Sequence, residues 1–160
     1  MIKELIYIIL LTFAPFLELR ASIPFGILKY PDIHWSIVFV TAVLANIVIG
    51  IIMYFFMDKI VHIFLRWKWF HKIYYTIVEK IQHKIHNAVE KYGELGVAIF
   101  IGIPLPGSGV YSAAIGSYLI GLEFRKFIIA NIIGVLIAGI IVTIVTLTGS
   151  EVFSLFVKTM

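Results

Sequence analysis

The chain contains no cysteine, and few of its residues are charged. Without cysteine there is no disulfide, thiolate metal site or nucleophilic thiol. Only 14% of the 160 residues are charged and 61% are hydrophobic, whereas about 25% of a soluble domain is charged. A soluble core cannot bury that much apolar surface, and no polar stretch is long enough to link two domains. The composition therefore predicts a single integral membrane domain over residues 1–160.

Sequence patterns for catalysis and metal binding are also missing. Ser108 and Ser112 have no neighbouring histidine base, and the segment Gly107–Gly109 lacks the glycine spacing of a nucleophile elbow. Of the five histidines, only His83 and His86 have a spacing that suits a metal, and no third ligand accompanies them. We expect neither an enzyme nor a metal or cofactor site.

Two uninterrupted apolar runs are long enough to cross a membrane. A transmembrane helix needs about 20 apolar residues, because each adds about 1.5 Å and the hydrocarbon core is about 30 Å thick. Residues 36–57 and 127–148 meet this requirement. Each run contains one asparagine, Asn46 or Asn131, which either lines a transport pathway or bonds to a neighbouring helix.

Two other apolar regions are interrupted by residues that end helices. In residues 5–30, the apolar run 5–17 is followed by charged residues and a proline, and in residues 97–122 the segment PLPGSG separates two apolar runs. A run of 13 residues reaches only about 20 Å, which ends inside the bilayer. We therefore predict two re-entrant hairpins. Proline-kinked helices that cross the membrane are the alternative.

The two halves of the chain resemble each other. Each has a broken hairpin followed by a full span, and Ala45–Gly50 (ANIVIG) parallels Ala130–Gly134 (ANIIG). An odd number of crossings separates the hairpins, so they enter the membrane from opposite faces. The predicted fold is an all-α inverted repeat of re-entrant hairpin plus transmembrane helix. Interrupted segments at matching positions in two halves indicate the binding site of a transporter.

Residues 58–94, between the two halves, form a basic segment with apolar residues at helical spacing. This pattern is typical of an amphipathic helix in the membrane interface, and a charged connector packed on the bundle is equally compatible with it. We expect a plasma-membrane protein with this segment and the turn at Arg125–Lys126 in the cytoplasm. Together they hold nine of the 13 Lys and Arg residues: Lys59, Arg66, Lys68, Lys72, Lys80, Lys84, Lys91, Arg125 and Lys126.

Glu18 and Arg20 are charged and lie between the apolar runs of the first hairpin. Insertion of such a group at membrane depth costs about 2.5–3.5 kcal/mol, so these residues tend to be paired and to mark a substrate or proton path. Glu18 is a candidate for binding a proton or cation, and Arg20 for binding an anion. A purely structural ion pair is the alternative. Ser22 is predicted to cap the returning helix, with Pro24 in its first turn.

The second hairpin carries the other candidate site. Small residues expose consecutive backbone N–H groups, and a helix that begins near Val110 adds partial positive charge, so we predict an anion-binding turn near the starts of both returning helices. A simple tight turn is the alternative. The candidate residues are Pro104, Pro106, Gly107, Ser108 and Gly109.

Three segments, Pro15–Pro24, Pro104–Gly116 and Glu123–Phe127, together with Gly134, resemble the small multidrug export proteins, a family that looks distantly similar to the DedA/VTT membrane proteins. The resemblance implies hairpins that face each other across the bilayer. It also implies flipping of lipid carriers such as polyprenyl phosphate, or scrambling of phospholipids, often with proton dependence. Glu18 matches the acidic residue of the first hairpin. The arginine that the DedA pattern places in the second hairpin is missing here, and Arg20 would replace its charge.

The sequence as a whole favours a small transporter or lipid flippase that binds membrane lipids, a lipid or small-molecule substrate, and protons or cations. One alternative is a proton-coupled multidrug exporter with four spanning helices that uses Glu18. Another is a non-transporting scaffold. We expect a homodimer or larger assembly, because two spans alone cannot shield both broken backbones from lipid. A nucleic-acid partner is not expected.

Overall fold

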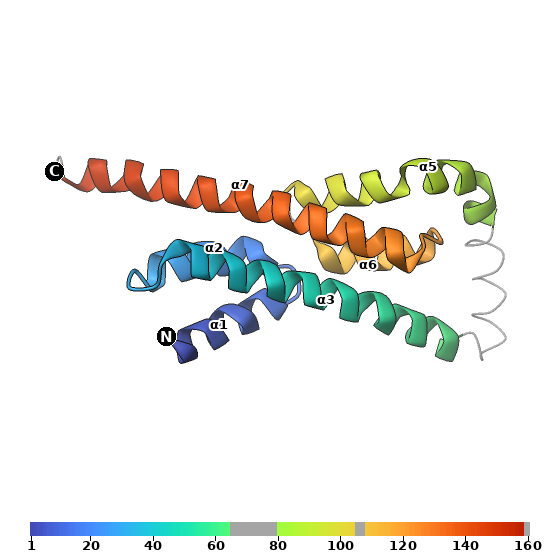
Figure 1. The fold of residues 1–160 in the computed structure, drawn as a ribbon, viewed down its shortest axis with the longest axis horizontal. Coiled ribbons are helices and arrows are strands. Elements are labelled where there is room, and N and C mark those ends of the chain that lie inside the picture. Colours follow the sequence, from blue (N-terminus) through green and yellow to red (C-terminus); the bar gives the residue numbers. More distant parts are fainter. Residues whose placement is uncertain (65–79, 105–107, 159–160) are drawn as a thin grey trace.

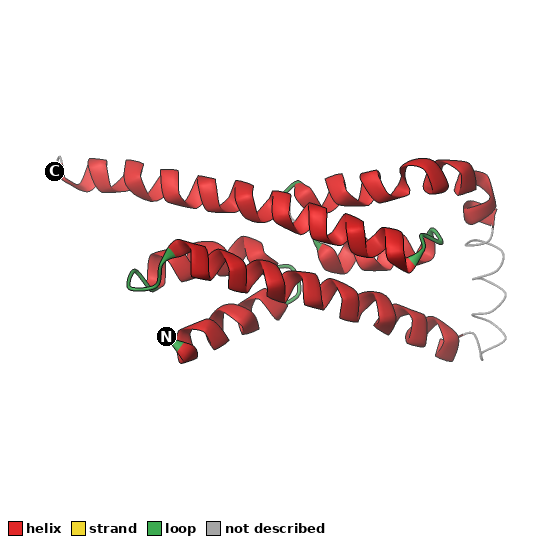
Figure 2. Cartoon of the chain, viewed as in Figure 1, coloured by secondary structure: helices red, strands yellow, loops and turns green. Residues whose placement is uncertain are grey.

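The computed structural model describes residues 1–64, 80–104 and 108–158. This part of the chain forms helices and contains no strand, so the predicted all-α class is confirmed (Figure 2). Part of the predicted linker, residues 65–79, lies outside the described residues, as do Pro106 and Gly107. The described helices are α1 (Ile2–Phe13), α2 (Glu18–Lys29), α3 (Trp35–Phe64), α5 (Lys80–Gly102), α6 (Val110–Leu119) and α7 (Phe124–Lys158).

The two long helices contain the predicted membrane spans. Within α3, Trp35–Met57 has a mean hydropathy of 2.6, and within α7, Phe124–Gly149 has a mean hydropathy of 2.8, so both segments are long and apolar enough to cross a membrane. Each helix continues past the predicted end of its span, α3 to Phe64 and α7 to Lys158. No proline follows either span to stop the helix.

The shorter helices form two helical hairpins on opposite ends of this pair. Hairpin 1 consists of α1 and α2, which pack on each other and on α3 (Figure 1). Hairpin 2 consists of the C-terminal part of α5 with α6, and packs on α7 and α3. The turns of both hairpins lie toward the middle of the molecule in Figure 1. The helices therefore break between Phe13 and Glu18 and between Gly102 and Val110, the two regions where the sequence carries helix-breaking residues.

One predicted boundary differs from the structure at the start of hairpin 2. The end of the predicted linker and the first arm of the hairpin form one continuous helix, α5, over 23 residues. Gly93 and Gly96 lie inside this helix, because isolated glycines only weaken a helix and do not end it.

The turn of hairpin 1 comes earlier than predicted. Backbone N–H groups of Leu17 and Glu18 both donate to the carbonyl of Ala14, at 3.2 and 3.3 Å. Phe16 has φ 69° and Glu18 has φ 50°, a left-handed conformation that costs a non-glycine residue about 1–2 kcal/mol. The four residues after Phe13 therefore complete the reversal, and α2 already begins at Glu18.

The predictions that Ser22 caps α2 and that Pro24 lies in its first turn are consequently wrong. Ser22 lies one turn inside the helix and is fully buried, where its hydroxyl shares a 2.6 Å hydrogen bond with the hydroxyl of Thr12 on α1. Pro24 also lies inside α2. Since proline has no N–H, it removes one backbone bond from the middle of this helix. Both residues therefore shape hairpin 1 itself.

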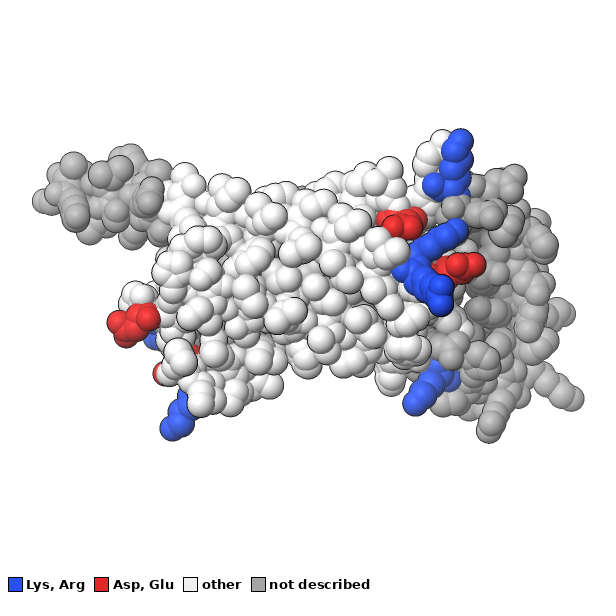
Figure 3. Space-filling view, in the orientation of Figure 1, with Lys and Arg blue, Asp and Glu red and all other residues white. Residues whose placement is uncertain are grey.

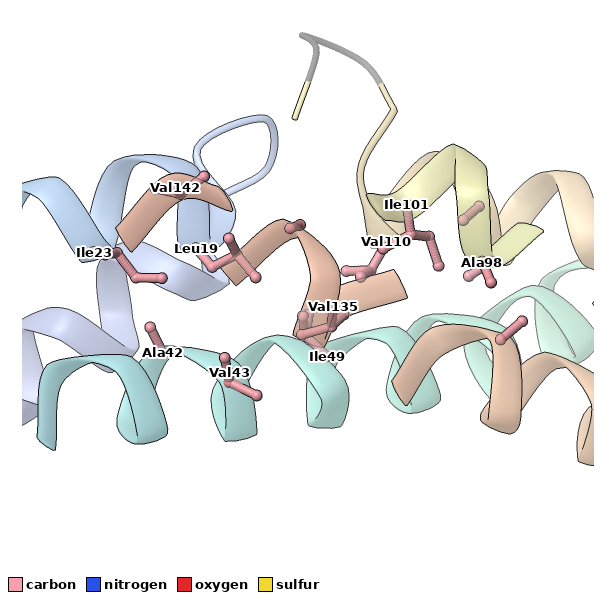
Figure 4. Packing of buried hydrophobic residues seen from close by; sticks show 14 of the residues in the cluster. Leu19, Ile23, Ala42, Val43, Ile49, Ala98, Ile101, Val110, Val135 and Val142 are labelled. Atoms are coloured by element: carbon pink, nitrogen blue, oxygen red, sulfur yellow. The ribbon is translucent and has the colours of Figure 1, made fainter. Parts of the chain in front are cut away.

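Small residues allow α3, α5 and α7 to approach closely. A Cβ added at Gly50 of α3 would lie 2.6 Å from Nδ2 of Asn131 on α7, and one added at Gly134 of α7 would lie 2.7 Å from the carbonyl oxygen of Ala98 on α5. Interfaces of this kind are common between membrane helices, where close packing replaces the hydrophobic driving force. Figure 4 shows the apolar residues that these helices bury with α2 and α6.

The outer surface is apolar over its middle and charged toward its ends. Large hydrophobic side chains are exposed on all the described helices, including Leu10, Leu44, Ile99, Ile115 and Val145. In the view of Figure 3, lysine and arginine gather mainly at one end of an uncharged middle zone. That end holds the end of α3, the first half of α5 and the start of α7 (Figure 1). An uncharged belt between charged ends is the surface that a lipid bilayer surrounds.

Candidate functional site

The starts of α2 and α6 meet at the carboxylate of Glu18. This side chain is only 4% exposed, and its Oε2 accepts a hydrogen bond of 3.2 Å from the backbone N–H of Val110, the first residue of α6. The first N–H groups of a helix have no partner inside the helix and carry partial positive charge, so a carboxylate is well placed there. The N-terminus of α6 thus receives an anion from within the chain, and that anion is Glu18.

Gly109 makes this contact sterically possible. It is the N-cap residue of α6, and a Cβ at this position would overlap both carboxylate oxygens of Glu18. Its backbone is extended, with φ −83° and ψ −176°, a conformation open to any residue. The glycine is therefore required by the proximity of Glu18, and not by the conformation of the chain.

Arg20, two residues further along α2, bonds to the turn of hairpin 2. Its Nη2 donates to Oγ of Ser108 at 3.0 Å and to the carbonyl oxygen of Ile103 at 3.5 Å. The hydroxyl of Ser108 in turn donates to that same carbonyl at 2.6 Å. Arg20 is partly exposed, whereas Glu18 is buried.

Tyr111 provides a third connection between the hairpins that sequence reasoning missed. Its hydroxyl donates to the carbonyl oxygen of Phe13, the last residue of α1, at 2.5 Å. The signal available in the sequence was a tyrosine in the first turn of a mostly apolar helix, because a tyrosine hydroxyl away from water needs a partner. The negative charge of Glu18 also acts electrostatically on both Tyr111 and Arg20.

The two asparagines behave differently from each other. Nδ2 of Asn131 on α7 donates to the carbonyl oxygen of Ile47 on α3 at 3.1 Å, so this residue bonds to a neighbouring helix, one of the two roles predicted for it. Asn46 is 1% exposed and has no such bond to a neighbouring helix; its Oδ1, like that of Asn131, has no hydrogen-bond partner in the described part of the chain.

The position of Asn46 along the bundle is set by the packing of α3 on α6. The rings of Tyr54 and Tyr118 lie 5.8 Å apart, and the two helices run in the same direction (Figure 1). Asn46 and Val110 each precede these tyrosines by eight residues. Asn46 therefore lies at about the depth of the contact between Glu18 and Val110.

The structure thus brings together four of the predicted site residues: Glu18, Arg20, Ser108 and Gly109. Pro104 lies in the turn of hairpin 2, next to Ile103, whose carbonyl accepts a hydrogen bond from Arg20. Ser22 and Pro24 lie further along α2. Among the residues that the structure describes, no group of three or more side chains has the composition of a metal site.

Two long apolar helices, an uncharged belt and a charged contact between two broken helices together define a helical membrane protein. A family model matches residues 18–141, and the chain belongs to that family, described as "Putative small multi-drug export protein". The match begins at Glu18 and therefore includes all four of the clustered site residues. Neither the curated proteins nor the solved structures contain a match to the chain.

Proposed function

We propose that this protein is a small membrane transporter whose binding site lies where the two hairpin turns meet. The observation that carries the proposal is the pair of contacts Glu18–Val110 and Arg20–Ser108, which place an acid and a base between two helix starts. Charged side chains at membrane depth are costly and mark substrate or ion pathways. The family description of export agrees with this assignment.

In the proposed topology, each hairpin enters the membrane, turns within it and returns to the side from which it entered. In its support, α1 and α2 have 12 residues each, and such a helix is about 18 Å long, short of the about 30 Å of hydrocarbon. The two halves then form an inverted repeat. The end that carries Lys59, Arg125 and Lys126 faces the cytoplasm of a multi-pass plasma-membrane protein.

We further propose an amphiphilic substrate with an anionic head group, such as a lipid-linked phosphate. Arg20 is partly exposed and carries a planar fork of donors that suits phosphate. The distant resemblance to the DedA/VTT proteins supports a flippase in particular. Glu18 takes the coupling proton or cation, and no covalent chemistry is required of the protein.

A second candidate function is export of cationic small molecules. Among the buried side chains of the described chain, Glu18 is the one that can gain or lose a proton. A buried carboxylate suits exchange of a proton for a cation. The family description also names drugs as the exported class. In this case Arg20 positions Glu18 and has no role in binding the substrate.

The proposed functional unit is a homodimer or a larger assembly. Phe16 at the turn of hairpin 1 is 81% exposed, and Ile103 at the turn of hairpin 2 is 46% exposed. If both turns lie at mid-depth, their backbones face hydrocarbon unless protein covers them.

The proposal is tested with purified protein in liposomes. Flipping of a fluorescent phospholipid is measured by quenching the fluorescence of the lipid in the outer leaflet. Uptake of a cationic dye is measured under a pH gradient. We expect Glu18→Gln and Arg20→Ala each to reduce lipid flipping by about tenfold or more, the effect of losing about 1.4 kcal/mol of interaction. Lys29→Gln, which removes an exposed charge from the same helix, is the control.

The two assays separate the candidates. Loss of dye uptake in Glu18→Gln with unchanged lipid flipping favours the cation exporter. Wild-type rates for both variants in both assays refute a transport site at this position.

A further inference from the structure

Three hydrogen bonds join the first turn region of α6 to hairpin 1. Val110 donates to Glu18, Arg20 donates to Ser108, and Tyr111 donates to the carbonyl of Phe13. In only the first of these is the acceptor a carboxylate, which a proton can neutralise. We propose that the Glu18–Val110 contact is a latch between the two hairpins that opens when Glu18 takes up a proton, and that Gly109 is its positioning residue. This inference deepens the proposed function, on which it rests, because the latch controls the proposed site.

The charged form of Glu18 is the form that holds the latch closed. A carboxylate is a stronger acceptor than a neutral acid, and its charge interacts favourably with the partial positive charge at the N-terminus of α6. Protonation removes that charge, turns one oxygen into a donor that the N–H of Val110 cannot accept, and leaves only a neutral carbonyl oxygen as a weaker acceptor. The charge-assisted part of the contact between α6 and the start of α2 is therefore lost, and the hydrogen bonds Arg20–Ser108 and Tyr111–Phe13 alone do not keep the two turns closed in this proposal.

Glu18 has few charged or titratable neighbours. It interacts electrostatically with Arg20 on its own helix α2 and with Tyr111 on α6. The buried polar side chains that α1, α3 and α7 contribute in the described chain are uncharged: Thr12, Asn46, Asn131 and Thr143. Arginine and tyrosine keep their charge states between neutral and acidic pH. The charged and titratable groups that the described helices place beside Glu18 therefore keep their charge over that range, and the Glu18→Gln variant tests whether Glu18 itself is responsible.

Gly109 provides an independent way to open the latch. A Cβ there would overlap both carboxylate oxygens of Glu18, while the extended backbone accepts alanine without strain. Gly109→Ala thus displaces the carboxylate and leaves its charge in place. Gly116 on the same helix is the matched control, because a Cβ at that position meets nothing within 4 Å.

The experiment measures the separation of the two hairpin turns directly. The chain has no cysteine, so paired spin labels attach only to introduced residues. Leu17→Cys and Ile103→Cys place labels at exposed positions, 43% and 46% exposed, one on each turn. In lipid nanodiscs at neutral pH we expect dipolar broadening between the labels, and we expect this broadening to be lost at acidic pH.

The variants decide whether Glu18 is the cause. We expect Glu18→Gln and Gly109→Ala to lack the broadening at every pH, and Gly116→Ala to retain both the broadening and its pH dependence. The double variant Glu18→Gln with Gly109→Ala is expected to open no further than either single variant, because both act on one contact. If Gly109→Ala does not fold, Glu18→Gln alone decides.

Two outcomes overturn the latch: broadening that does not change with pH, or broadening that Glu18→Gln retains. These results leave the transport assays untouched, since the label measurement requires no substrate. Conversely, a pH-dependent separation in a protein whose transport is unaffected by Glu18→Gln and Arg20→Ala refutes the proposed function and leaves the latch in place.

Discussion

The N–H of Val110 lies 3.2 Å from the carboxylate of Glu18, although the two residues are 92 positions apart in the sequence. Glu18 is the first residue of α2 and Val110 is the first residue of α6. One carboxylate therefore lies at the start of both returning helices, and at the N-terminus of α6 it takes the place of the capping side chain that this helix lacks. A single buried acid thus connects α2 and α6, the returning helices of two hairpins that pack on opposite ends of α3 and α7.

The orientation of hairpin 1 predicts which introduced cysteines share a side of the membrane. Lys3 lies in the first turn of α1 and Lys29 ends α2, and both are exposed. If hairpin 1 is re-entrant, an impermeant maleimide applied to intact cells labels Lys3→Cys and Lys29→Cys and does not label Arg125→Cys. A spanning α1 or α2 moves Lys29→Cys to the opposite side from Lys3→Cys. Labelling after permeabilisation controls for the reactivity of each thiol.

The two buried asparagines predict opposite effects of substitution by leucine. Asn131→Leu loses the 3.1 Å hydrogen bond to Ile47 and leaves that carbonyl without the amide, so we expect it to lower the free energy of unfolding by about 1–2 kcal/mol. Asn46→Leu breaks no bond of this kind and removes an amide oxygen that, like that of Asn131, has no partner in the described chain, so the free energy is expected to stay equal or to rise.

Reversible unfolding in mixed detergent micelles measures both changes. Equal destabilisation by the two variants contradicts the difference in bonding between the two asparagines. A loss of transport by Asn46→Leu without any loss of stability would identify Asn46 as part of the pathway, the other role predicted from the sequence.

The helices of the fold could be predicted from the lengths of the apolar runs and from the residues that interrupt them. Apolar runs of 22 residues or more can satisfy all backbone groups only as helices across the membrane, and these became parts of α3 and α7. The prolines and glycines of PLPGSG predicted a break, which lies between Gly102 and Val110. Glu18 and Arg20 were predicted as site residues because charge is costly among apolar neighbours.

Other features depended on information that a linear pattern does not carry. The start of α2 was misplaced, because Phe16 and Glu18 adopt positive φ values that are not expected of these residue types. Tyr111 was missed because its partner is a backbone carbonyl, which every residue has. The steric role of Gly109 required the position of a carboxylate from a distant segment.

The buried hydroxyl pair within hairpin 1 predicts a measurable coupling. Thr12 and Ser22 share a 2.6 Å hydrogen bond, and Thr12 also donates to the carbonyl of Ile8 at 2.8 Å. We expect Thr12→Val and Ser22→Ala each to destabilise the protein, and the double variant to cost about 0.5–1.5 kcal/mol less than the sum of the two. Additive effects in the unfolding assay would show that the two hydroxyls act independently.

The contact between Gly50 and Asn131 predicts a large effect from one added methyl group. A Cβ at Gly50 would lie 2.6 Å from Nδ2 and 2.8 Å from Oδ1 of Asn131, so Gly50→Ala must displace the amide and with it the bond to Ile47. We expect a loss of about 2–3 kcal/mol in the free energy of unfolding, from overpacking and the broken bond together. Gly96→Ala adds the same methyl group where nothing lies within 4 Å, and we expect it to leave stability unchanged or slightly raised.

A second-site change tests whether the amide is the reason for that loss. Asn131→Ala removes the side chain with which the new methyl group collides. In that background, Gly50→Ala is expected to cost about 1 kcal/mol or less, so the two substitutions are strongly non-additive. If Gly50→Ala costs as much in the Asn131→Ala background as it does in the unsubstituted chain, the glycine is required by the approach of the α3 and α7 backbones, and the asparagine is not what excludes a side chain there.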